Sequence, residues 1–318
     1  LGLWAADYYQ HPVGDALMHL LPAKLRQPLP NQLIQLNWQI ADVDEEFGRA
    51  KKQQLLWQQL KTLAPAFNLN QLQTIGIKPS QLKPFLDKKW LTTSHPKPQD
   101  VTLKLAEKGL ILNPEQSHIV EHLAKAKGVF SCNLLNGVTG SGKTEVYFHA
   151  IAHQLQEGKR TLLLVPEIGL TPQLLQRLEQ RFNNRVLALH SGLTEHQRLN
   201  AWQQAGLGQA DIIIGTRSAL FTPIPHLGLI IIDEEHDQAY KQQEGFRYHG
   251  RDLAIKRAAD ANIPILLGSA TPSLESLANA ARGRFSQWLL NQRAGKASSQ
   301  SYQVIDLRNQ PQQAGISE

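Results

Sequence analysis

The sequence predicts an α/β protein in which a parallel sheet flanked by helices follows a smaller α+β unit. Three observations lead to this prediction. Apolar, β-rich runs alternate with amphipathic helical patterns between residues 113 and 290, and a glycine-rich loop follows the first of these runs. Three short helical patterns precede the alternation. The 318 residues are enough for about two domains.

The composition is that of an ordinary globular protein. Hydrophobic residues make up 42% of the chain and charged residues 19%, which excludes extensive disorder. The formal charge of +6 permits an anionic partner. The single cysteine, Cys132, excludes an internal disulfide and a zinc site of several thiolates, and we predict a buried, inert thiol. Because the chain has neither an apolar run of about 18–20 residues nor a secretory signal, we expect a cytoplasmic protein without a membrane span.

The two ends of the chain lack a regular pattern. Residues 1–47 contain prolines at positions 12, 22, 28 and 30, which favour irregular connections. Within this stretch, "LWAADYY" predicts a short helix that packs on something outside the chain. Residues 291–318 have the character of a connection to a further part. The chain opens on Leu1 instead of methionine, so we expect a fragment of a longer protein.

Residues 48–112 have the element order of a winged-helix domain. Leucines at helical spacing predict the first helix: Leu55, Leu56, Leu60 and Leu63. Two shorter helical patterns follow, over 68–76 and 79–90, and then a strand over 100–112. Seven lysines against three acidic residues between positions 78 and 108 favour contact with DNA. A three-helix spacer with solvated lysines is the alternative.

Residues 113–290 predict the large sheet. Six apolar runs are expected to be strands: 129–135, 161–165, 186–189, 211–215, 227–233 and 264–268. Amphipathic helices are expected between them, for example over 144–158 and 171–182. Continuous apolar strands separated by helices are typical of a parallel sheet buried on both faces. In such a sheet the chemistry lies at the carboxyl ends of the strands.

The strongest functional signal is "GVTGSGKT", residues 137–144, which matches the phosphate-binding pattern G-x-x-x-x-G-K-[ST]. It follows a predicted strand and opens a predicted helix, so its backbone N–H groups can hold the phosphates of ATP. We expect Lys143 to neutralise phosphate charge and Thr144 to bind Mg²⁺. The residues assigned to the nucleotide are Gly137, Gly140, Ser141, Gly142, Lys143 and Thr144.

A second strand end supplies carboxylates. Asp233 follows the apolar run "LGLIII" and is the expected second ligand of Mg²⁺. Glu234 points in another direction and is placed to polarise the attacking water. A solvated acidic turn is the alternative, and the phosphate loop makes it the weaker one.

Six stretches together resemble superfamily 2 helicases and, more closely, the PriA (primosomal protein N′) family of replication-restart helicases. They are "GVTGSGKTEVY", "VPEIGLTPQ", "LHSGL", "IGTRSALF", "IDEEHDQAYKQQEGFRYHGRDLA" and "LGSATPSLESL". The resemblance implies that residues 113–290 are the first RecA-like lobe of a helicase that moves 3′ to 5′ on DNA. It also implies that residues 1–47 end a preceding DNA-binding domain and that 291–318 lead to a second lobe.

Carried onto single residues, the resemblance implies four further roles near the nucleotide. Gln116 would read the edge of adenine, and His236 would link the nucleotide site to elements that sense DNA. Ser269 and Thr271 of "GSAT" would couple hydrolysis to movement. For these two residues, an ordinary helix cap before Pro272 is the alternative.

The resemblance also implies a path for DNA at the strand ends. The residues expected to line it are Thr171, Gln173, Thr216, Arg217 and Ser218. Hydroxyl, amide and guanidinium groups bind phosphates without reading bases, as a motor that tolerates any sequence requires. Taken singly, each of these residues could equally belong to a turn.

Residues 236–249, here called the aromatic loop, are expected to contact single-stranded DNA. The side chains assigned to this role are Tyr240, Phe246, Arg247, Tyr248 and, just beyond the loop, Arg251. Aromatic rings stack on unpaired bases, and arginines meet phosphates or rings. The alternative is that the aromatic side chains anchor a long loop in the core.

The resemblance implies the cofactors and partners as well. ATP and Mg²⁺ are expected here, whereas the zinc of the full-length family needs a cysteine cluster that this chain lacks. Expected partners are stalled-fork and single-stranded DNA, single-strand binding protein and other primosome proteins, with the protein a monomer. Because the arginine finger belongs to a second lobe, we expect the chain alone to bind ATP weakly and to unwind nothing.

Two other functions remain open to test. One is a DNA-structure-binding module whose ATPase lobe is catalytically silent. The other is a small-molecule P-loop kinase, in which "GTRSA", "GSAT" and the aromatic loop would have no purpose.

Overall fold

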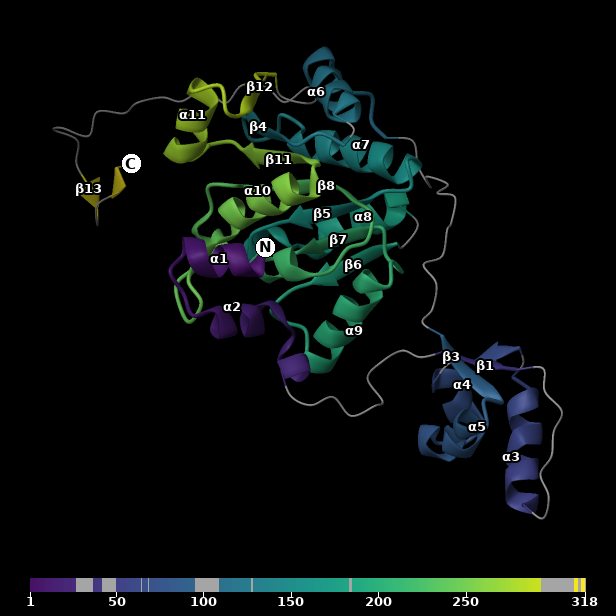
Figure 1. Cartoon of the computed structure of the whole chain (residues 1–318). Helices are drawn as coiled ribbons and strands as arrows, with labels where there is room; N and C mark the ends of the chain where they lie inside the picture. The colour runs from purple at the N-terminus through teal and green to yellow at the C-terminus, as the bar shows by residue number, and fades with distance from the viewer. Residues whose placement is uncertain are drawn as a thin grey trace.

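The computed structural model describes residues 1–26, 37–41, 50–63, 65–67, 69–94, 109–126, 128–182, 185–292, 312–313 and 316–317 (Figure 1). Most of the strand predicted over 100–112 and most of the connection over 291–318 lie outside these ranges; residues 109–112, which are described, do not form a strand. Near the C-terminus, β13 (Gln312–Gln313) pairs antiparallel with β14 (Ile316–Ser317).

Residues 37–94 form a small unit with its own core. Its elements are β1 (Asn37–Ile40), α3 (Lys51–Lys61), β2 (Ala66–Phe67), α4 (Leu69–Thr74), η2 (Pro79–Leu82), α5 (Lys83–Asp87) and β3 (Leu91–Ser94). The antiparallel sheet has the order β2-β1-β3. Helix α3 buries Trp57 and Leu60 in the core, while Leu55 is 62% exposed. The winged-helix interpretation stays a prediction, because the segment that would form the wing is outside the described residues.

A parallel sheet dominates the rest of the described chain and confirms the predicted fold class. Its seven strands there are β4 (Ser131–Gly137), β5 (Arg160–Leu164), β6 (Val186–Leu189), β7 (Ile212–Gly215), β8 (Leu227–Ile232), β11 (Pro264–Ser269) and β12 (Ser286–Leu290). The spatial order is β12-β4-β11-β8-β5-β7-β6. All six predicted apolar runs are strands.

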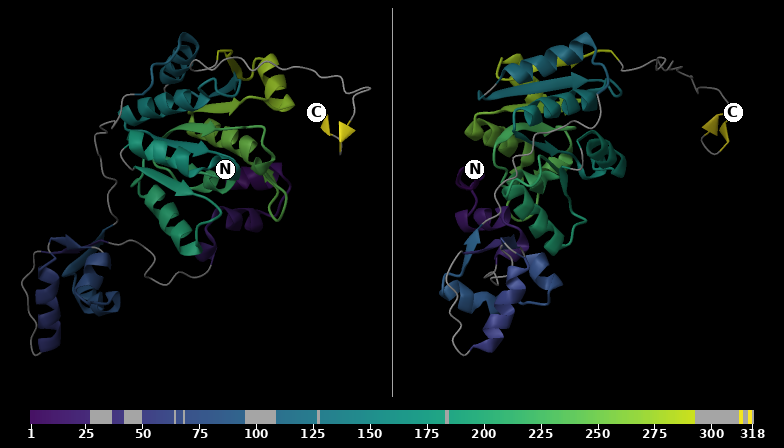
Figure 2. Two further views of the ribbon diagram at one scale, coloured as in Figure 1. Left: turned by 180° about the vertical axis from the view of Figure 1, so that it is seen from behind. Right: turned by 90° about the vertical axis from the view of Figure 1, so that its right-hand side faces the viewer.

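Helices cover both faces of this sheet (Figure 2). On one face lie α6 (Pro114–Lys125), α7 (Lys143–Gln156) and α8 (Pro172–Phe182). On the other lie α9 (Glu195–Gly206), α10 (Gly250–Ala261) and α11 (Leu274–Ala281). Both predicted helices, over 144–158 and 171–182, correspond to α7 and α8. Burial on both faces explains why the central strands are continuously apolar.

Strand β12 was not predicted. It pairs parallel with β4, from Ser286 opposite Asn133 to Leu290 opposite Gly137. Within the described part of the chain this edge strand has one neighbour, β4, and among its side chains only that of Leu290 is buried. A strand of this kind lacks the long apolar run by which the others are recognised.

The N-terminal segment, residues 1–26, packs on the lobe. It consists of α1 (Gly2–Tyr8), α2 (Val13–Leu20) and η1 (Ala23–Arg26), and Figure 1 places α1 beside α10, with α2 packed against α1. Ala5, Ala6 and Ala16 are buried in the same core cluster as the aromatic loop. The expectation that "LWAADYY" packs on something outside the chain is therefore wrong, although the helix itself forms.

Within the described ranges, the helices are all too short or too polar to cross a membrane. Cys132 is a free, buried thiol, as predicted, and burial raises its pKa.

Candidate nucleotide and DNA site

The loop between β4 and α7 has the geometry of a phosphate cradle. Gly140 and Gly142 have φ angles of 80° and 84°, a left-handed conformation that favours glycine. A Cβ at Gly137 would lie 2.6 Å from Ser141 Oγ and 3.0 Å from Leu290 Cβ, so the turn closes only with glycine there. Since α7 begins at Lys143, its free N–H groups face this turn.

The residues present fit ATP and Mg²⁺. Lys143 Nζ donates to the carbonyl of Gly137 at 2.8 Å and lies 3.9 Å from Glu234 Oε1. Ser141 Oγ is buried, and none of the described residues hydrogen-bonds to it. No group of three His, Cys, Asp or Glu side chains in the described ranges could hold a metal. Mg²⁺ does not need one, because it keeps water and phosphate oxygens beside one or two protein ligands such as Thr144 and Asp233.

Two tyrosines fix Asp233: Tyr147, which the sequence analysis did not single out, and Tyr240, which it assigned to DNA. Tyr147 Oη donates to Asp233 Oδ1 at 2.8 Å, and Tyr240 Oη donates to the Asp233 carbonyl at 2.7 Å. Burial raises the pKa of the Asp233 carboxyl above its ordinary value, while the bond from Tyr147 and the charge of Lys143 oppose the rise. Tyr147 lies one helical turn beyond Lys143, a spacing that could have identified it.

The carboxyl ends of β8 and β11 are joined through His236. Its Nδ1 lies 2.7 Å from Ser269 Oγ and 3.6 Å from Glu234 Oε2, and its Nε2 lies 3.4 Å from Thr271 Oγ1. The structure thus brings together four residues predicted from the "DEEH" and "GSAT" stretches. Ser269 also accepts from the backbone N–H of Thr271 at 3.0 Å, the bond expected of a capping turn. These contacts are compatible with both interpretations of Ser269 and Thr271: a role in coupling hydrolysis to movement, and an ordinary helix cap.

Gln116 is buried beside the phosphate loop, at the start of α6. Its Nε2 donates to the carbonyl of Ser141 at 2.9 Å, and its Oε1 accepts from the N–H of Asn113 at 2.9 Å. One N–H and one lone pair of the amide remain for an adenine edge. Its role in reading adenine stays a prediction.

Glu235 and Arg251 form a buried ion pair. Arg251 Nη1 donates to Glu235 Oε2 at 2.9 Å, and the fully buried carboxylate also accepts from the Ser273 N–H at 2.7 Å and from Ser276 Oγ at 2.9 Å. These bonds tie α10 and α11 to the end of β8. Arg251 is 7% exposed, so in this structure it holds the fold instead of facing DNA as predicted.

The aromatic loop packs inward, and the rings assigned to DNA are corrected accordingly. Tyr240, Phe246 and Tyr248 are 0%, 2% and 3% exposed, because they belong to the main core cluster. Rings of the N-terminal segment pack against them: His11 and His19 lie 5.2 and 5.8 Å from the Phe246 ring, centroid to centroid. In this arrangement the aromatic side chains anchor the loop and cannot stack on a base. Arg247 is exposed.

The predicted DNA residues at the strand ends differ in their surroundings. Arg217 is half-buried; its Nη1 donates to the carbonyls of Ala239 and Lys241 at 2.7 and 2.8 Å, and its Nη2 bonds Gln242 Oε1. It therefore fastens the aromatic loop to η4 (Arg217–Phe221). Thr216 is buried, whereas Ser218 is exposed.

The other two predicted DNA residues lie at the start of α8. Thr171 and Gln173 are exposed, and Thr171 Oγ1 accepts from the N–H of Leu174 at 3.2 Å. This bond is that of a helix cap. It leaves the threonine on the surface, so contact with DNA stays a prediction.

A phosphate loop and paired carboxylates at one edge of a parallel sheet define a RecA-like nucleotide-binding lobe. The model of the DEAD/DEAH box helicase family matches residues 113–280, more than half of the chain. The chain belongs to this family.

Curated relatives confirm the resemblance to PriA. Replication restart protein PriA of Haemophilus influenzae is 43% identical over 330 residues, which cover 99% of this chain and 44% of that protein. PriA of Chlamydia pneumoniae is 36% identical over 332 residues, 96% of this chain and 43% of that protein. The chain thus spans less than half the length of these relatives. A solved structure of RecG bound to a three-way DNA junction aligns with 60% of this chain and 25% of its own at 23% identity and a TM-score of 0.44.

Replacing Lys143 by alanine tests the nucleotide site. In the complete protein, Lys143→Ala removes the charge next to the phosphate loop, and we expect ATP hydrolysis to fall by about 10²–10³-fold. DNA affinity measured by fluorescence anisotropy should stay within twofold of the wild type. Lys125→Ala, on the exposed surface of α6, is the matched control and should leave both unchanged. Equal loss of both activities in Lys143→Ala would mean that the lysine is structural.

Replacing Arg251 by alanine tests the corrected role of this residue. Arg251→Ala leaves the Glu235 carboxylate buried without its partner, and we expect the free energy of unfolding to drop by about 3–5 kcal/mol. Urea denaturation followed by circular dichroism measures the change. The exposed Arg247→Ala is the control, with an effect within about 0.5 kcal/mol. Unchanged stability with weakened DNA binding would restore the original assignment of Arg251.

Proposed function

We propose that this chain contributes the first motor lobe of an ATP-dependent DNA helicase that restarts bacterial replication forks and moves 3′ to 5′ on single-stranded DNA. The observation that carries the proposal is a connected set of side chains at the edge of the sheet. Lys143 contacts Glu234, His236 contacts Glu234 and Ser269, and Tyr240 of the aromatic loop donates to the backbone carbonyl of Asp233, the residue before Glu234. Through these contacts, a movement of the residues around the nucleotide can be transmitted to the aromatic loop.

The chain's own residues have definite tasks in this function. When bound, ATP with Mg²⁺ would supply the phosphoanhydride whose cleavage drives movement. The phosphate loop and Lys143 would hold and neutralise the phosphates, and Thr144 and Asp233 would bind the metal ion. Glu234 would accept the proton that the attacking water loses as the bond to the leaving ADP breaks. His236, which contacts both Glu234 and Ser269, would transmit the resulting change of charge on Glu234 to Ser269.

We further propose the partners that the PriA relationship suggests. They are branched fork DNA, single-strand binding protein and other primosome proteins, with the protein acting as a monomer. We expect bound zinc in the complete protein, on residues outside this chain. The chain alone should bind ATP weakly and fail to unwind DNA, because a helicase of this kind completes its ATP site with an arginine from a second lobe.

A DNA-structure-binding role without catalysis is the second candidate. It is favoured by one observation: seven lysines stand against three acidic residues between positions 78 and 108, in the stretch predicted to contact DNA. In this role the lobe would respond to nucleotide only through its affinity for DNA. ATP-dependent changes in DNA affinity without turnover would identify it.

Replacing Ser269 by alanine tests coupling. In the complete protein, Ser269→Ala removes the hydroxyl that meets His236, and we expect unwinding of a forked substrate to fall by about 3- to 30-fold. ATP affinity, measured with a fluorescent nucleotide, should be unchanged. Ser286→Ala, an exposed serine on the edge strand, is the matched control.

One result for Ser269→Ala would contradict the coupling role of the serine, and one result for the wild type would contradict the helicase proposal. Wild-type unwinding by Ser269→Ala would remove the serine from the coupling path. A complete wild-type protein that binds forked DNA but shows no ATP hydrolysis stimulated by single-stranded DNA would favour the second candidate.

A further inference from the structure

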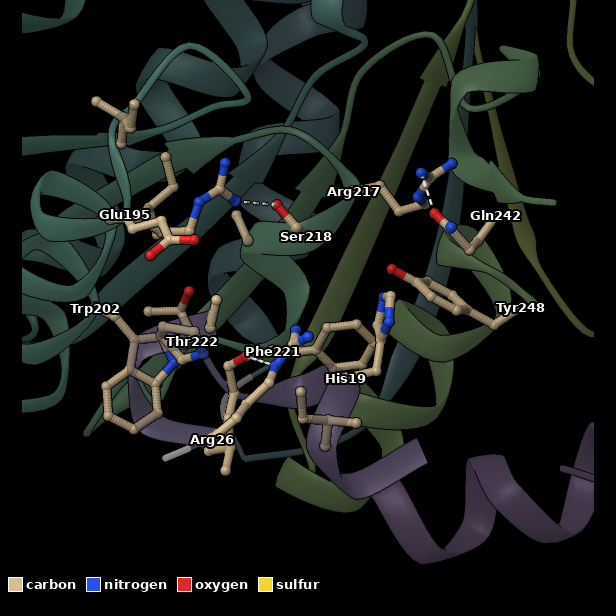
Figure 3. Close-up of a pocket in the computed structure, with 18 residues that line it drawn as sticks. His19, Arg26, Glu195, Trp202, Arg217, Ser218, Phe221, Thr222, Gln242 and Tyr248 are labelled. Carbon is tan, nitrogen blue, oxygen red and sulfur yellow. Dashed lines mark hydrogen bonds between the residues drawn. The ribbon is translucent and has the colours of Figure 1, made fainter. Parts of the chain in front are cut away.

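A pocket of about 410 Å³ lies where the N-terminal segment meets the lobe (Figure 3). Its walls come from three parts of the chain, represented by His19 and Arg26, by Arg198 and Trp202 of α9, and by Arg217 and Tyr248. Figure 3 shows Arg26 and Trp202 on one side of the pocket and Arg217 with Tyr248 on the other. The volume is in the range of known ligand sites.

The lining of this pocket is positively charged. Arg26, Arg198 and Arg217 all line it, and Glu195 is the only carboxylate within the described lining. The pKa of His19 is lowered, first by burial and then by the positive charges of Arg26 and Arg217. The lowered pKa favours the uncharged form of His19 at neutral pH, so the arginines are the main cations of the pocket. Such a lining favours an anion.

Two of the arginines keep donors for a ligand. Arg26 Nε donates to the carbonyl of Leu21 at 3.1 Å, which uses one of its five N–H groups. Arg198 donates to the carbonyl of His190 at 2.9 Å and to Ser218 Oγ at 3.4 Å. Arg217, in contrast, donates its hydrogen bonds mainly to residues of the aromatic loop. Anything that reaches Arg217 here also touches the bonds that hold the loop.

The pocket continues into a groove. A cavity of about 250 Å³ shares Arg198, Arg217 and Ser218 with it. A third, of about 280 Å³, shares Glu167, Ser191 and Thr216 with the second and reaches Pro172 at the start of α8. Three adjoining cavities along the carboxyl ends of β5, β6 and β7 suit a chain molecule better than a compact ligand.

We propose that the N-terminal segment completes a phosphate site of the DNA path, in which Arg26 and Arg198 hold a backbone phosphate of single-stranded DNA. The half-buried ring of Trp202 forms an aromatic wall on which a base can stack. Arg217 and Gln242 connect the occupant to the aromatic loop, although the loop's own rings are buried. This inference rests on the proposed function and adds to it a part of the chain that precedes the small unit.

Binding of a single-stranded oligothymidylate to the complete protein tests the proposal. Fluorescence anisotropy over a series of salt concentrations gives the affinity and its salt slope. We expect Arg26→Ala to weaken binding by about 3- to 10-fold and to reduce the slope by about 0.7, the value for one lost phosphate contact on a single strand. Arg26→Lys, which keeps the charge, should keep the slope. Arg26 is exposed, so its loss should leave the fold intact, and thermal unfolding checks this.

Controls separate this proposal from the proposed function. Arg282→Ala removes an equally exposed arginine after α11 and should change neither affinity nor slope. An unchanged slope in Arg26→Ala, with a wild type still stimulated by DNA, would overturn the phosphate site and leave the helicase proposal standing. A loss of ATP affinity instead of DNA affinity would assign the pocket to nucleotide. Absence of DNA stimulation in the wild type would count against the proposed function itself.

Discussion

Burial of the parallel sheet on both faces decides where the polar groups of this lobe can lie. The middles of the central strands are fully buried, so functional side chains gather beyond their carboxyl ends. The order β12-β4-β11-β8-β5-β7-β6 then divides that edge into two halves. The neighbours β4, β11 and β8 carry the nucleotide residues, and the neighbours β5, β7 and β6 border the groove.

The aromatic loop contacts both halves of the edge, which gives its inward packing a purpose. Tyr240 reaches Asp233 on the nucleotide side, and Arg217 reaches the loop from the end of β7. The same loop is covered by rings of the N-terminal segment, including Tyr9, whose hydroxyl accepts from the N–H of His249 at 3.1 Å. Because the loop is bonded to Asp233, to Arg217 and to the N-terminal segment, a movement of any of these three can shift the loop. Stacking of its own rings on DNA is not needed for that.

Elements that depend on a local sequence pattern were predicted correctly. The surroundings of side chains that depend on tertiary packing were not. Six strands and the phosphate loop were recognisable because apolar runs and glycine spacing are local features. The burial of Phe246 depends on the N-terminal segment, far away in the chain, and the pairing of Arg251 with Glu235 depends on how α10 and α11 pack at the end of β8. Neither shows in the local pattern, so an aromatic stretch with two arginines looked like a DNA surface. Docking of the N-terminal segment was equally invisible, because its buried side chains are chiefly alanines. Domain boundaries and the winged-helix interpretation remain predictions.

Strand β12 has a consequence for how this lobe can be shortened. The family match ends at residue 280, but the sheet continues to Leu290, whose side chain supports the turn at Gly137. A lobe cut at the motif boundary would expose the backbone of β4 as a new sheet edge, open to pairing with other chains. It would also remove Leu290, which packs against Gly137 of the phosphate loop. The unit that must stay together for a stable ATP site is therefore longer than the unit that sequence motifs define.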